Sequence, residues 1–489
     1  MNTQLRHLAV FATVLIAVLI GATTYWQSWA AGGLANREGN QVQRVVQLQL
    51  DRGTIYAADG TRLAWSVPHK KNGQTIYSRK YTKNPAFAQV IPALDQAQAA
   101  SLSGTNTNLT NALTQELDRL GGKTVHGNDI KLTLKPSAQA LAERLLAGRC
   151  GAVVAMNPKT GAVYALASSP TYDPNLVLQT GGQAKIAKVG GAGGCGLNSA
   201  GLNRATQGLY PPGSTFKLVT ASAALDSGKF TPTSRFIDPG YCIEYGTKVS
   251  NSSSPDGGSE IFGSIDLSSA LEHSVNSVFC NIGKALGAGK ILDYAKRYGF
   301  YSSPPVDTPS NTVYPSGLYK GHRQLWWPKN PVRADAGRIA FGQYKLLATP
   351  LQMALVAATI GNRGDEPRPY LVQKVTAPDG STVSTTEPGS LGHPISAKTA
   401  AQLKQMMRLV VQGGTAAGVG FNPSLDVAGK TGTAELGLGN VYDSWFTSFA
   451  PASNPKVAVA VVVEKQPNGF GATYAAPIAK AMIENLLHR

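Results

Sequence analysis

The chain has 489 residues, a formal net charge of +17 from 45 Lys and Arg against 28 Asp and Glu, 43% hydrophobic residues, 15% charged residues and four cysteines. These values exclude a small disulfide-rich domain and an intrinsically disordered chain, because there is ample apolar material to bury and too little charge to keep the chain expanded. The length predicts about two or three domains, and the basic excess suits an anionic neighbour such as lipid headgroups, an envelope polymer or nucleic acid without choosing among them.

The N-terminus indicates a membrane anchor. A short tail, residues 1–7, contains Arg6, and residues 8–26 contain no charged residue. At 1.5 Å per residue this stretch matches a hydrocarbon layer about 30 Å thick. We expect a single transmembrane helix over residues 8–27, with the N-terminus in the cytoplasm and the rest of the chain outside it. Cleavage after Ala30 is the alternative, and it would change the tethering but not the compartment.

Residues 33–148 are expected to form a small non-catalytic module that serves as a pedestal or in dimerisation. Residues 46–50 and 130–134 alternate in polarity as strands do, and Pro136 opens a helix. Residues 84–128 are polar and lack the apolar clusters of a core.

Residues 149–489 are expected to form an α/β layered domain. A hairpin is predicted near each end, with mostly helical patterns between them and a closing helix at residues 477–487. Because both pairs are hairpins, we expect a mainly antiparallel sheet built from distant parts of the chain. The predicted strand pairs are 152–156 with 162–167 and 445–449 with 457–463.

The cysteines leave their pairing open. In an oxidising compartment they allow three disulfide connectivities, and buried free thiols are the alternative. Their spacing excludes a CxxC metal or redox motif. The four are Cys150, Cys195, Cys242 and Cys280.

Several other motif matches are rejected because the neighbouring residues do not fit the motif. Gly191–Gly196 fits GxGxxG but leads into a loop rather than a helix, and Gly429-Lys430-Thr431 has Ser424 where a phosphate-binding loop needs its first glycine. We therefore exclude nucleotide binding. The seven histidines have no paired helical spacing, so no metal site is predicted, and there is no GxSxG elbow.

Three short segments remain. Pro211-Pro212-Gly213 precedes Ser214, which lies in the first turn of a predicted buried helix over residues 214–227. The i, i+3 spacing brings the amine of Lys217 beside the Ser214 hydroxyl, and a desolvated lysine near another cation can accept a serine proton. An isolated SxxK pattern is common by chance.

The second segment is Ser274-Val275-Asn276, between two predicted helices. A hydroxyl and an amide there can relay a proton and hold a substrate amide, and ordinary helix capping is the alternative.

The third segment is Lys430-Thr431-Gly432-Thr433, at the end of a predicted strand that begins near Leu425. An edge strand with glycine allows close approach of an extended peptide, and the lysine and threonines suit a carboxylate. A surface turn is the alternative.

Together, in this order and behind an export anchor, the segments resemble the SxxK, SxN and KTG signature of the penicillin-binding proteins, which are serine acyltransferases. The resemblance covers nearly the whole chain, most closely residues 150–487, and is closest to the class B enzymes of the actinobacterial penicillin-binding protein A group. Between the expected anchor and Arg52 there is no room for a glycosyltransferase domain, so we expect a monofunctional enzyme. Other matching segments are 157–161, 167–175, 203–205, 342–343 and 349–354.

The resemblance implies a penicillin-binding, serine β-lactamase-like transpeptidase fold with a helical subdomain, and a membrane-anchored D,D-transpeptidase that cross-links peptidoglycan stem peptides. Ser214 would attack the D-Ala-D-Ala donor, with Lys217 as its base and Ser274 as the proton relay. The N–H groups of Ser214 and Thr433 would hold the oxyanion. Asn276 would bind the donor amide, and its carboxylate would meet the segment Lys430, Thr431, Gly432 and Thr433.

The resemblance also implies no cofactor and no metal, no nucleic acid as partner, β-lactams as inhibitors, and partners among division or elongation proteins. Three alternatives stay open. A D,D-carboxypeptidase would use water as acceptor, a β-lactamase would need a further deacylating base, and a non-catalytic protein would act as a drug sensor or scaffold.

Overall fold

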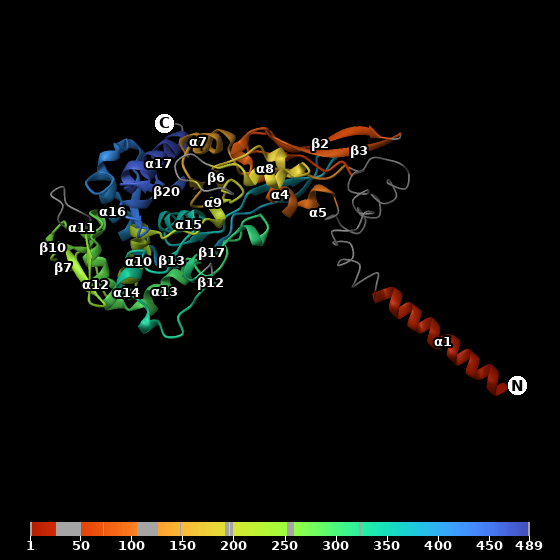
Figure 1. Ribbon diagram of the computed structural model, residues 1–489, viewed down its shortest axis with the longest axis horizontal. Helices are drawn as coiled ribbons and strands as arrows, with labels where there is room; N and C mark the ends of the chain where they lie inside the picture. Colours follow the sequence, from red (N-terminus) through yellow and green to blue (C-terminus); the bar gives the residue numbers. More distant parts are fainter. Residues whose placement is uncertain are drawn as a thin grey trace.

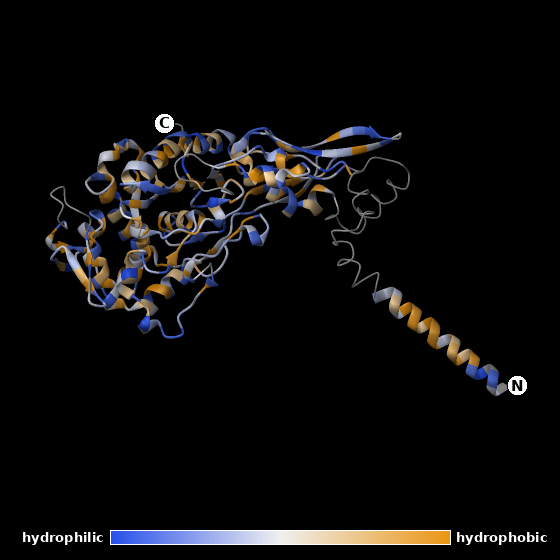
Figure 2. Ribbon diagram, in the orientation of Figure 1, coloured by the Kyte–Doolittle hydropathy of each residue, from blue (hydrophilic) through white to orange (hydrophobic). Residues whose placement is uncertain are grey.

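The computed structural model describes residues 2–25, 50–71, 73–104, 126–146, 148–190, 195, 199–251, 259–321 and 324–487 (Figure 1). The predicted strand at 46–49, residues 26 and 27 of the predicted anchor, and most of the Gly191–Gly196 motif lie outside these residues. Helix α1 (Asn2–Thr24) contains a stretch, Arg6–Thr24, long and apolar enough to cross a membrane and not buried by the protein. Figure 2 shows this apolar stretch following a hydrophilic N-terminal end.

A five-stranded antiparallel sheet forms the centre of the C-terminal region, in the order β18-β19-β20-β5-β6. Both predicted hairpins are present, and they lie side by side because β20 pairs with β5 across about 300 residues of sequence. The strands are β5 (Gly151–Met156), β6 (Val163–Ser169), β18 (Ala428–Glu435), β19 (Val441–Ala450) and β20 (Val457–Pro467).

Helices cover both faces of this sheet, so its strands are apolar on both sides. In β5, Val153 packs in a cluster with α7 (Pro136–Leu146) and α17 (Gly471–Leu487), whereas Val154 packs on the opposite side with α15 (Pro350–Gly361). The closing helix α17 begins earlier than predicted, and Pro477 lies inside it rather than in its first turn.

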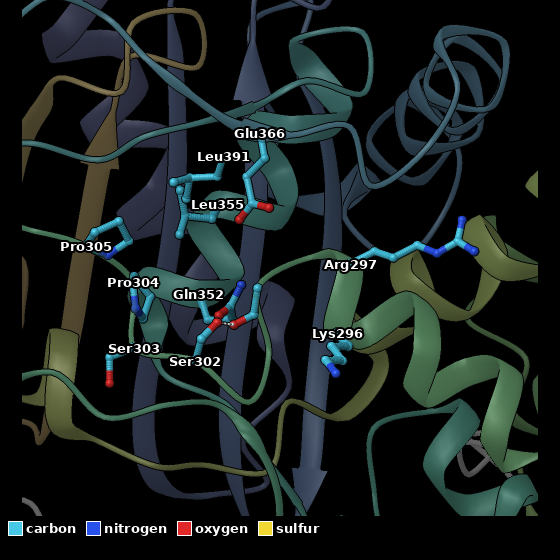
Figure 3. A pocket seen from close by; sticks show the side chains of 11 residues that line it. Lys296, Arg297, Ser302, Ser303, Pro304, Pro305, Gln352, Leu355, Glu366 and Leu391 are labelled. Carbon is cyan, nitrogen blue, oxygen red and sulfur yellow. Dashed lines mark hydrogen bonds between the residues drawn. The ribbon is translucent and has the colours of Figure 1, made fainter.

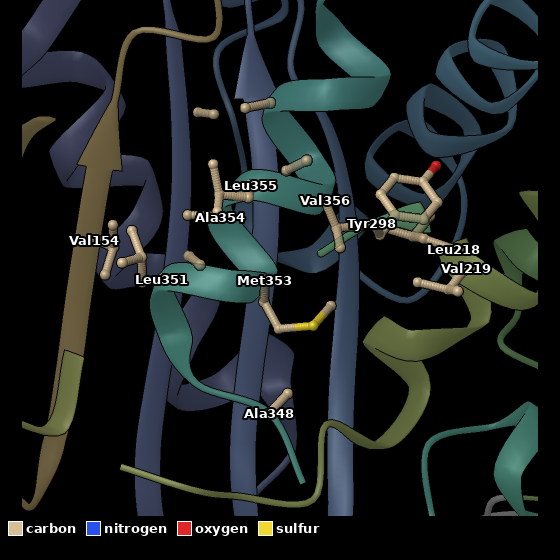
Figure 4. Close-up of a cluster of buried hydrophobic side chains, with 14 of the residues drawn as sticks. Val154, Leu218, Val219, Tyr298, Ala348, Leu351, Met353, Ala354, Leu355 and Val356 are labelled. Carbon is tan, nitrogen blue, oxygen red and sulfur yellow. The ribbon is translucent and has the colours of Figure 1, made fainter. Parts of the chain in front are cut away.

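Helix α15 is buried along its whole length. Figure 4 shows Leu351 facing Val154 of β5 on one side, and Val356 facing Tyr298 and Leu218 on the other. The sheet is thereby joined to a helical layer. Its helices are α10 (Lys217–Asp226), α11 (Leu267–Glu272), α12 (Asn276–Leu286), α13 (Ala288–Arg297), α14 (Ala336–Ala340) and α16 (Ala397–Gln412).

A six-stranded sheet, in the order β16-β15-β4-β1-β2-β3, combines strands from both sides of the predicted boundary at residues 148 and 149. β1 and β4 are parallel, and β15 joins β4 antiparallel. The sheet therefore ties the N-terminal module to the C-terminal region. Its strands are β1 (Ile55–Tyr56), β2 (Arg62–Lys71), β3 (Gln74–Tyr81), β4 (Asp129–Leu132), β15 (Val372–Thr376) and β16 (Thr382–Thr385).

The expectation that residues 84–128 lack the apolar clusters of a core was wrong for residues 84–104. This segment forms η2 (Pro85–Phe87), α4 (Ile91–Ala97) and α5 (Ala99–Leu102). Its few large apolar side chains are spaced so that they all point inward, which a low average hydrophobicity conceals. Phe87, Ile91, Leu94 and Leu102 are buried.

Further short elements lie between these, besides the 3₁₀ turns η5 (Ser310–Thr312), η6 (Pro331–Arg333), η7 (Ala417–Val419) and η8 (Pro423–Leu425). They are η3 (Pro174–Leu178), α8 (Gly182–Ala187), α9 (Arg204–Gln207), β7 (Arg235–Asp238) paired with β10 (Gly263–Asp266), β8 (Tyr241–Glu244) paired with β9 (Thr247–Ser250), β11 (Gly317–Lys320) paired with β12 (Gln324–Leu325) and β13 (Leu346–Leu347), and β14 (Glu366–Pro367) paired with β17 (Ser390–Gly392).

Two disulfides settle the pairing that the sequence left open. Cys150 bonds to Cys195, and Cys242 bonds to Cys280. The second bond joins the hairpin of β8 and β9 to helix α12.

We predict that the double variant Cys242→Ser, Cys280→Ser is less stable by about 4 kcal/mol, because the bond closes a long loop in the unfolded chain. The two cysteines are 38 residues apart. Urea unfolding of the oxidised full chain in detergent measures the difference. A midpoint equal to that of the oxidised wild type would contradict the prediction.

Candidate active site

Ser214 lies in a 3₁₀ turn, η4 (Gly213–Phe216), directly before α10. The sequence predicted an α-helix from Ser214, but two prolines and Gly213, at φ +52°, impose the tighter turn. Side chains three residues apart eclipse in a 3₁₀ turn, so Ser214 and Lys217 lie on the same side. Ser214 is half-buried and Lys217 is fully buried.

This turn packs closely against β18, the edge strand that carries the Lys430–Thr433 segment. A Cβ on Gly432 would lie 2.9 Å from the Thr215 Cγ2 atom, and a Cβ on Gly213 would lie 2.9 Å from the Thr433 carbonyl oxygen. Only glycine at both positions permits this approach. The segment lies in the middle of the strand, which begins at Ala428, rather than at its end.

The Lys217 amine contacts the Ser274–Asn276 segment. Its Nζ donates to the Ser274 carbonyl oxygen at 2.5 Å, to the Asn276 Oδ1 at 2.7 Å and to the Ser274 Oγ at 3.3 Å. Among the described residues no hydrogen bond joins the Ser214 Oγ to Lys217. The predicted pair therefore shares a side of the turn, and the lysine's hydrogen bonds go to the second segment.

Lys430 approaches the same hydroxyl from β18. Its Nζ donates to the Ser274 Oγ at 2.8 Å and to the Thr431 carbonyl oxygen at 3.1 Å. Ser274 has a φ of +60° and so stands in the left-handed region, between α11 and α12. Its hydroxyl is within hydrogen-bond distance of two buried amines.

Burial disfavours the charged form of both amines. It lowers the pKa of Lys430 to about 7. Burial, with the neighbouring charge of Lys430, lowers the pKa of Lys217 well below its usual value. Lys430 can thus carry and release a proton near neutral pH, and the Lys217 amine loses its proton more readily than an exposed lysine does.

The start of α12 is held by two residues that the sequence analysis missed. The Ser277 N–H donates to the Asn251 Oδ1 at 2.9 Å, and the Asn251 Nδ2 donates to the carboxylate of the buried Asp238 at 2.9 Å. The Asn276 Nδ2 donates to the Ser250 carbonyl oxygen at 3.1 Å. No local motif marks these residues, because they lie 25 to 38 positions before the helix they hold.

The three segments meet at a cleft of about 480 Å³. Lys217, Lys430 and Gly432 do not line this cleft, whereas the other predicted residues do. Those are Ser214, Ser274, Asn276, Thr431 and Thr433.

Residues outside the three segments also line the cleft, and the sequence analysis did not assign them to the site. The Thr415 hydroxyl lies 2.6 Å from that of Thr431, and the rings of Tyr442 and Phe470 stack at 6.4 Å between centroids. The others include Glu260, His273, Phe341, Gln343 and Glu435.

The chain is similar to known proteins over most of its length. The family model "Penicillin binding protein transpeptidase domain" matches residues 151–484. The peptidoglycan D,D-transpeptidase PbpA of Mycolicibacterium smegmatis is 34% identical, over 99% of this chain and 98% of its own length. PbpA of Mycobacterium tuberculosis is 32% identical, over 100% and 99%.

Solved structures show the same likeness. Penicillin-binding protein A from M. tuberculosis, as a ceftriaxone acyl-enzyme complex, superposes with a TM-score of 0.77 at 31% identity, covering 91% of this chain and all of that one. Its penicillin G acyl-enzyme complex gives a TM-score of 0.75 at 30% identity, covering 90% and 100%. The expected fold is confirmed.

We predict that Lys430→Met raises the free energy of unfolding near neutral pH by about 2 kcal/mol, because it removes a buried cation. The pKa of Lys430 is about 7 in the folded state, so the cost of burying its charge is largest below about pH 7. This cost disappears above the pKa of the lysine in the unfolded chain, where the amine is neutral in both states. The gain should therefore shrink as pH rises toward about 10.

Urea unfolding at both pH values measures this effect, with the exposed Lys398→Met as the control that should show little change. A destabilised Lys430→Met at neutral pH, or a gain that grows with pH, would contradict the prediction.

Proposed function

This chain belongs to the penicillin-binding protein transpeptidase family, and from that premise we propose that it is a serine-type peptidoglycan D,D-transpeptidase whose nucleophile is Ser214. The observation that carries the residue assignment is the convergence of two fully buried lysine amines on the Ser274 hydroxyl, beside a half-buried serine that lines the cleft. A desolvated lysine amine of this kind can serve as the general base that a serine nucleophile needs.

In the acylation step the Ser214 Oγ attacks the carbonyl carbon of the penultimate D-Ala of a stem peptide, and Lys217 takes the hydroxyl proton. The C–N bond to the terminal D-Ala breaks, and its amine leaves with a proton delivered through Ser274, which Lys430 resupplies. The Ser214 to Lys217 hydrogen bond needed for this step forms when substrate binds, as such bonds often tighten only in the complex.

Substrate contacts follow from the placement of the remaining residues. The N–H groups of Ser214 and Thr433 stabilise the oxyanion, for which donors held in place before reaction are the most effective. The hydroxyls of Thr431 and Thr433, with Lys430 behind them, attract the terminal carboxylate, and Asn276 binds the donor's amide. Gly432 keeps β18 accessible to an extended peptide.

In the second step an amine from a neighbouring stem peptide attacks the acyl-enzyme and forms the cross-link, releasing Ser214. A β-lactam acylates the same serine, and its leaving group stays attached and blocks this step. The titles of the solved relatives describe such acyl-enzymes for those proteins.

We also propose how the chain is arranged in the cell. Helix α1 anchors it in the membrane, with Arg6 and the N-terminus in the cytoplasm and the cleft outside. Residues 149–489 form the transpeptidase domain, and residues 33–148 form the non-catalytic module that meets division or elongation proteins.

Ser214→Ala should abolish acylation by penicillin, because among the described residues that line the cleft no other hydroxyl lies in the turn beside β18. Intact mass with peptide mapping measures the adduct, and Ser227→Ala at the end of α10 should be labelled like the wild type. A Ser214→Ala protein that is still labelled would refute the assignment, and rapid consumption of the drug by the wild type would indicate a β-lactamase.

The acceptor is tested by product analysis. With a donor ending in D-Ala-D-Ala and a stem peptide that has a free side-chain amine, we expect the amide-linked dimer to exceed the hydrolysed donor. Ser214→Ala should form neither product. Hydrolysis alone at every amine concentration would make the protein a carboxypeptidase.

A further inference from the structure

A second cavity, of about 250 Å³, lies away from the cleft and shares no lining residue with it. It is bounded by the end of α13 and the loop that follows, by α15 and by β14 (Figure 3). Nothing in the acyl transfer uses it.

Two side-chain oxygens in this cavity have no hydrogen-bond partner among the described residues. They are the Oε1 of Gln352, which is fully buried, and the Oε1 of Glu366, which is 2% exposed. The Gln352 amide nitrogen is already used, donating to the Tyr298 carbonyl oxygen. Buried acceptors are nearly always paired in folded proteins, so two in one cavity point to a missing donor.

Both oxygens lie near Gly299. A Cβ on Gly299 would lie 3.3 Å from the Glu366 Oε1 and 3.8 Å from the Gln352 Oε1. Gly299 has a φ of +79° and leaves this space open. A group with several N–H bonds that enters this space therefore lies close to both oxygens.

The cations at the rim are engaged elsewhere. Lys296 lies over the ring of Trp327, and Arg297 pairs with Asp293 at 3.1 Å. In Figure 3 the side chain of Arg297 points away from Glu366. The other lining side chains are two serines, whose hydroxyls donate to the carbonyl oxygens of Gly299 and Val313, and four apolar residues. They are Ser302, Ser303, Pro304, Pro305, Leu355 and Leu391.

We propose that this cavity binds a small primary amine, with its ammonium group donating to Glu366 and Gln352 and its apolar part against Leu355 and Leu391. A neutral hydroxyl could donate to one oxygen only and would gain no ion pair. The ammonium can donate to both acceptors, and its positive charge pairs with the negative charge of the buried Glu366 carboxylate.

The protonation state of Glu366 makes amine binding at this site depend on pH. Burial, with the charge of the adjacent Asp365, raises the pKa of Glu366 to about 8. The other ionisable groups near it are Tyr298, Lys296 and Arg297, and His393 lies 3.8 Å from Asp365. Binding of an ammonium requires the ionised carboxylate, so the carboxyl proton is released to solvent.

Affinity should therefore rise about tenfold from about pH 7 to about pH 9, since an alkylamine stays charged up to about pH 10. Isothermal titration of the full chain in detergent with n-butylamine, in buffers of different ionisation enthalpy, measures both the affinity and the proton release. n-Butanol serves as the neutral comparison.

Glu366→Gln keeps the shape and removes the charge, and we expect it to weaken n-butylamine binding at least tenfold. Leu391→Trp, at the rim, should block entry without changing Glu366. The exposed Glu387→Gln should bind as the wild type does. Penicillin acylation at an unchanged rate checks that each variant is folded, and it separates this proposal from the function of the cleft.

The proposal is overturned if n-butylamine does not bind the wild type, if n-butanol binds equally well, or if Glu366→Gln and Leu391→Trp both leave the affinity unchanged. Binding without proton release near neutral pH would also overturn it, because Glu366 would then not be the partner of the amine.

Discussion

The cleft depends on the removal of two lysine side chains from water within reach of one serine hydroxyl. A buried ammonium is costly, and two neighbouring ones repel each other, so the amines shift toward their neutral forms. The fold tolerates this because Ser274, Asn276 and the Thr431 carbonyl accept their hydrogen bonds. The free-energy cost of burying the two amines therefore falls at the site where a deprotonated amine is needed to accept a proton.

Each lysine lies on a different element, and buried packing contacts and hydrogen bonds hold these elements in place. Lys217 starts α10, whose Leu218 packs with α15, and the Thr447 hydroxyl of β19 bonds to the backbone of α15 at the Met353 carbonyl oxygen. Lys430 lies on β18, which β19 pairs along its whole length. The Ser274 loop is fixed by the buried pair of Asp238 and Asn251 and by the disulfide of α12. A small shift in any of these would separate the amines from the hydroxyl they share.

Much could be predicted from local patterns. The two terminal hairpins, the antiparallel sheet and the apolar N-terminal helix follow from periodicity and turn residues, which act within a few positions. The motif residues were recognisable because their spacing reflects local geometry, such as the turn that aligns Ser214 with Lys217. The start of α17 was missed because a proline usually marks a first turn, and Pro477 lies inside the helix.

The sequence by itself determined which residues carry chemistry, which strands form hairpins and that an apolar helix begins the chain. Only the tertiary structure decided that β20 pairs with β5, that β15 enters the N-terminal sheet, and which cysteines bond. It alone revealed Asp238, Asn251 and the unpaired oxygens of Gln352 and Glu366. Such contacts join residues far apart in the chain, and they depend on burial and close approach, which no local pattern encodes.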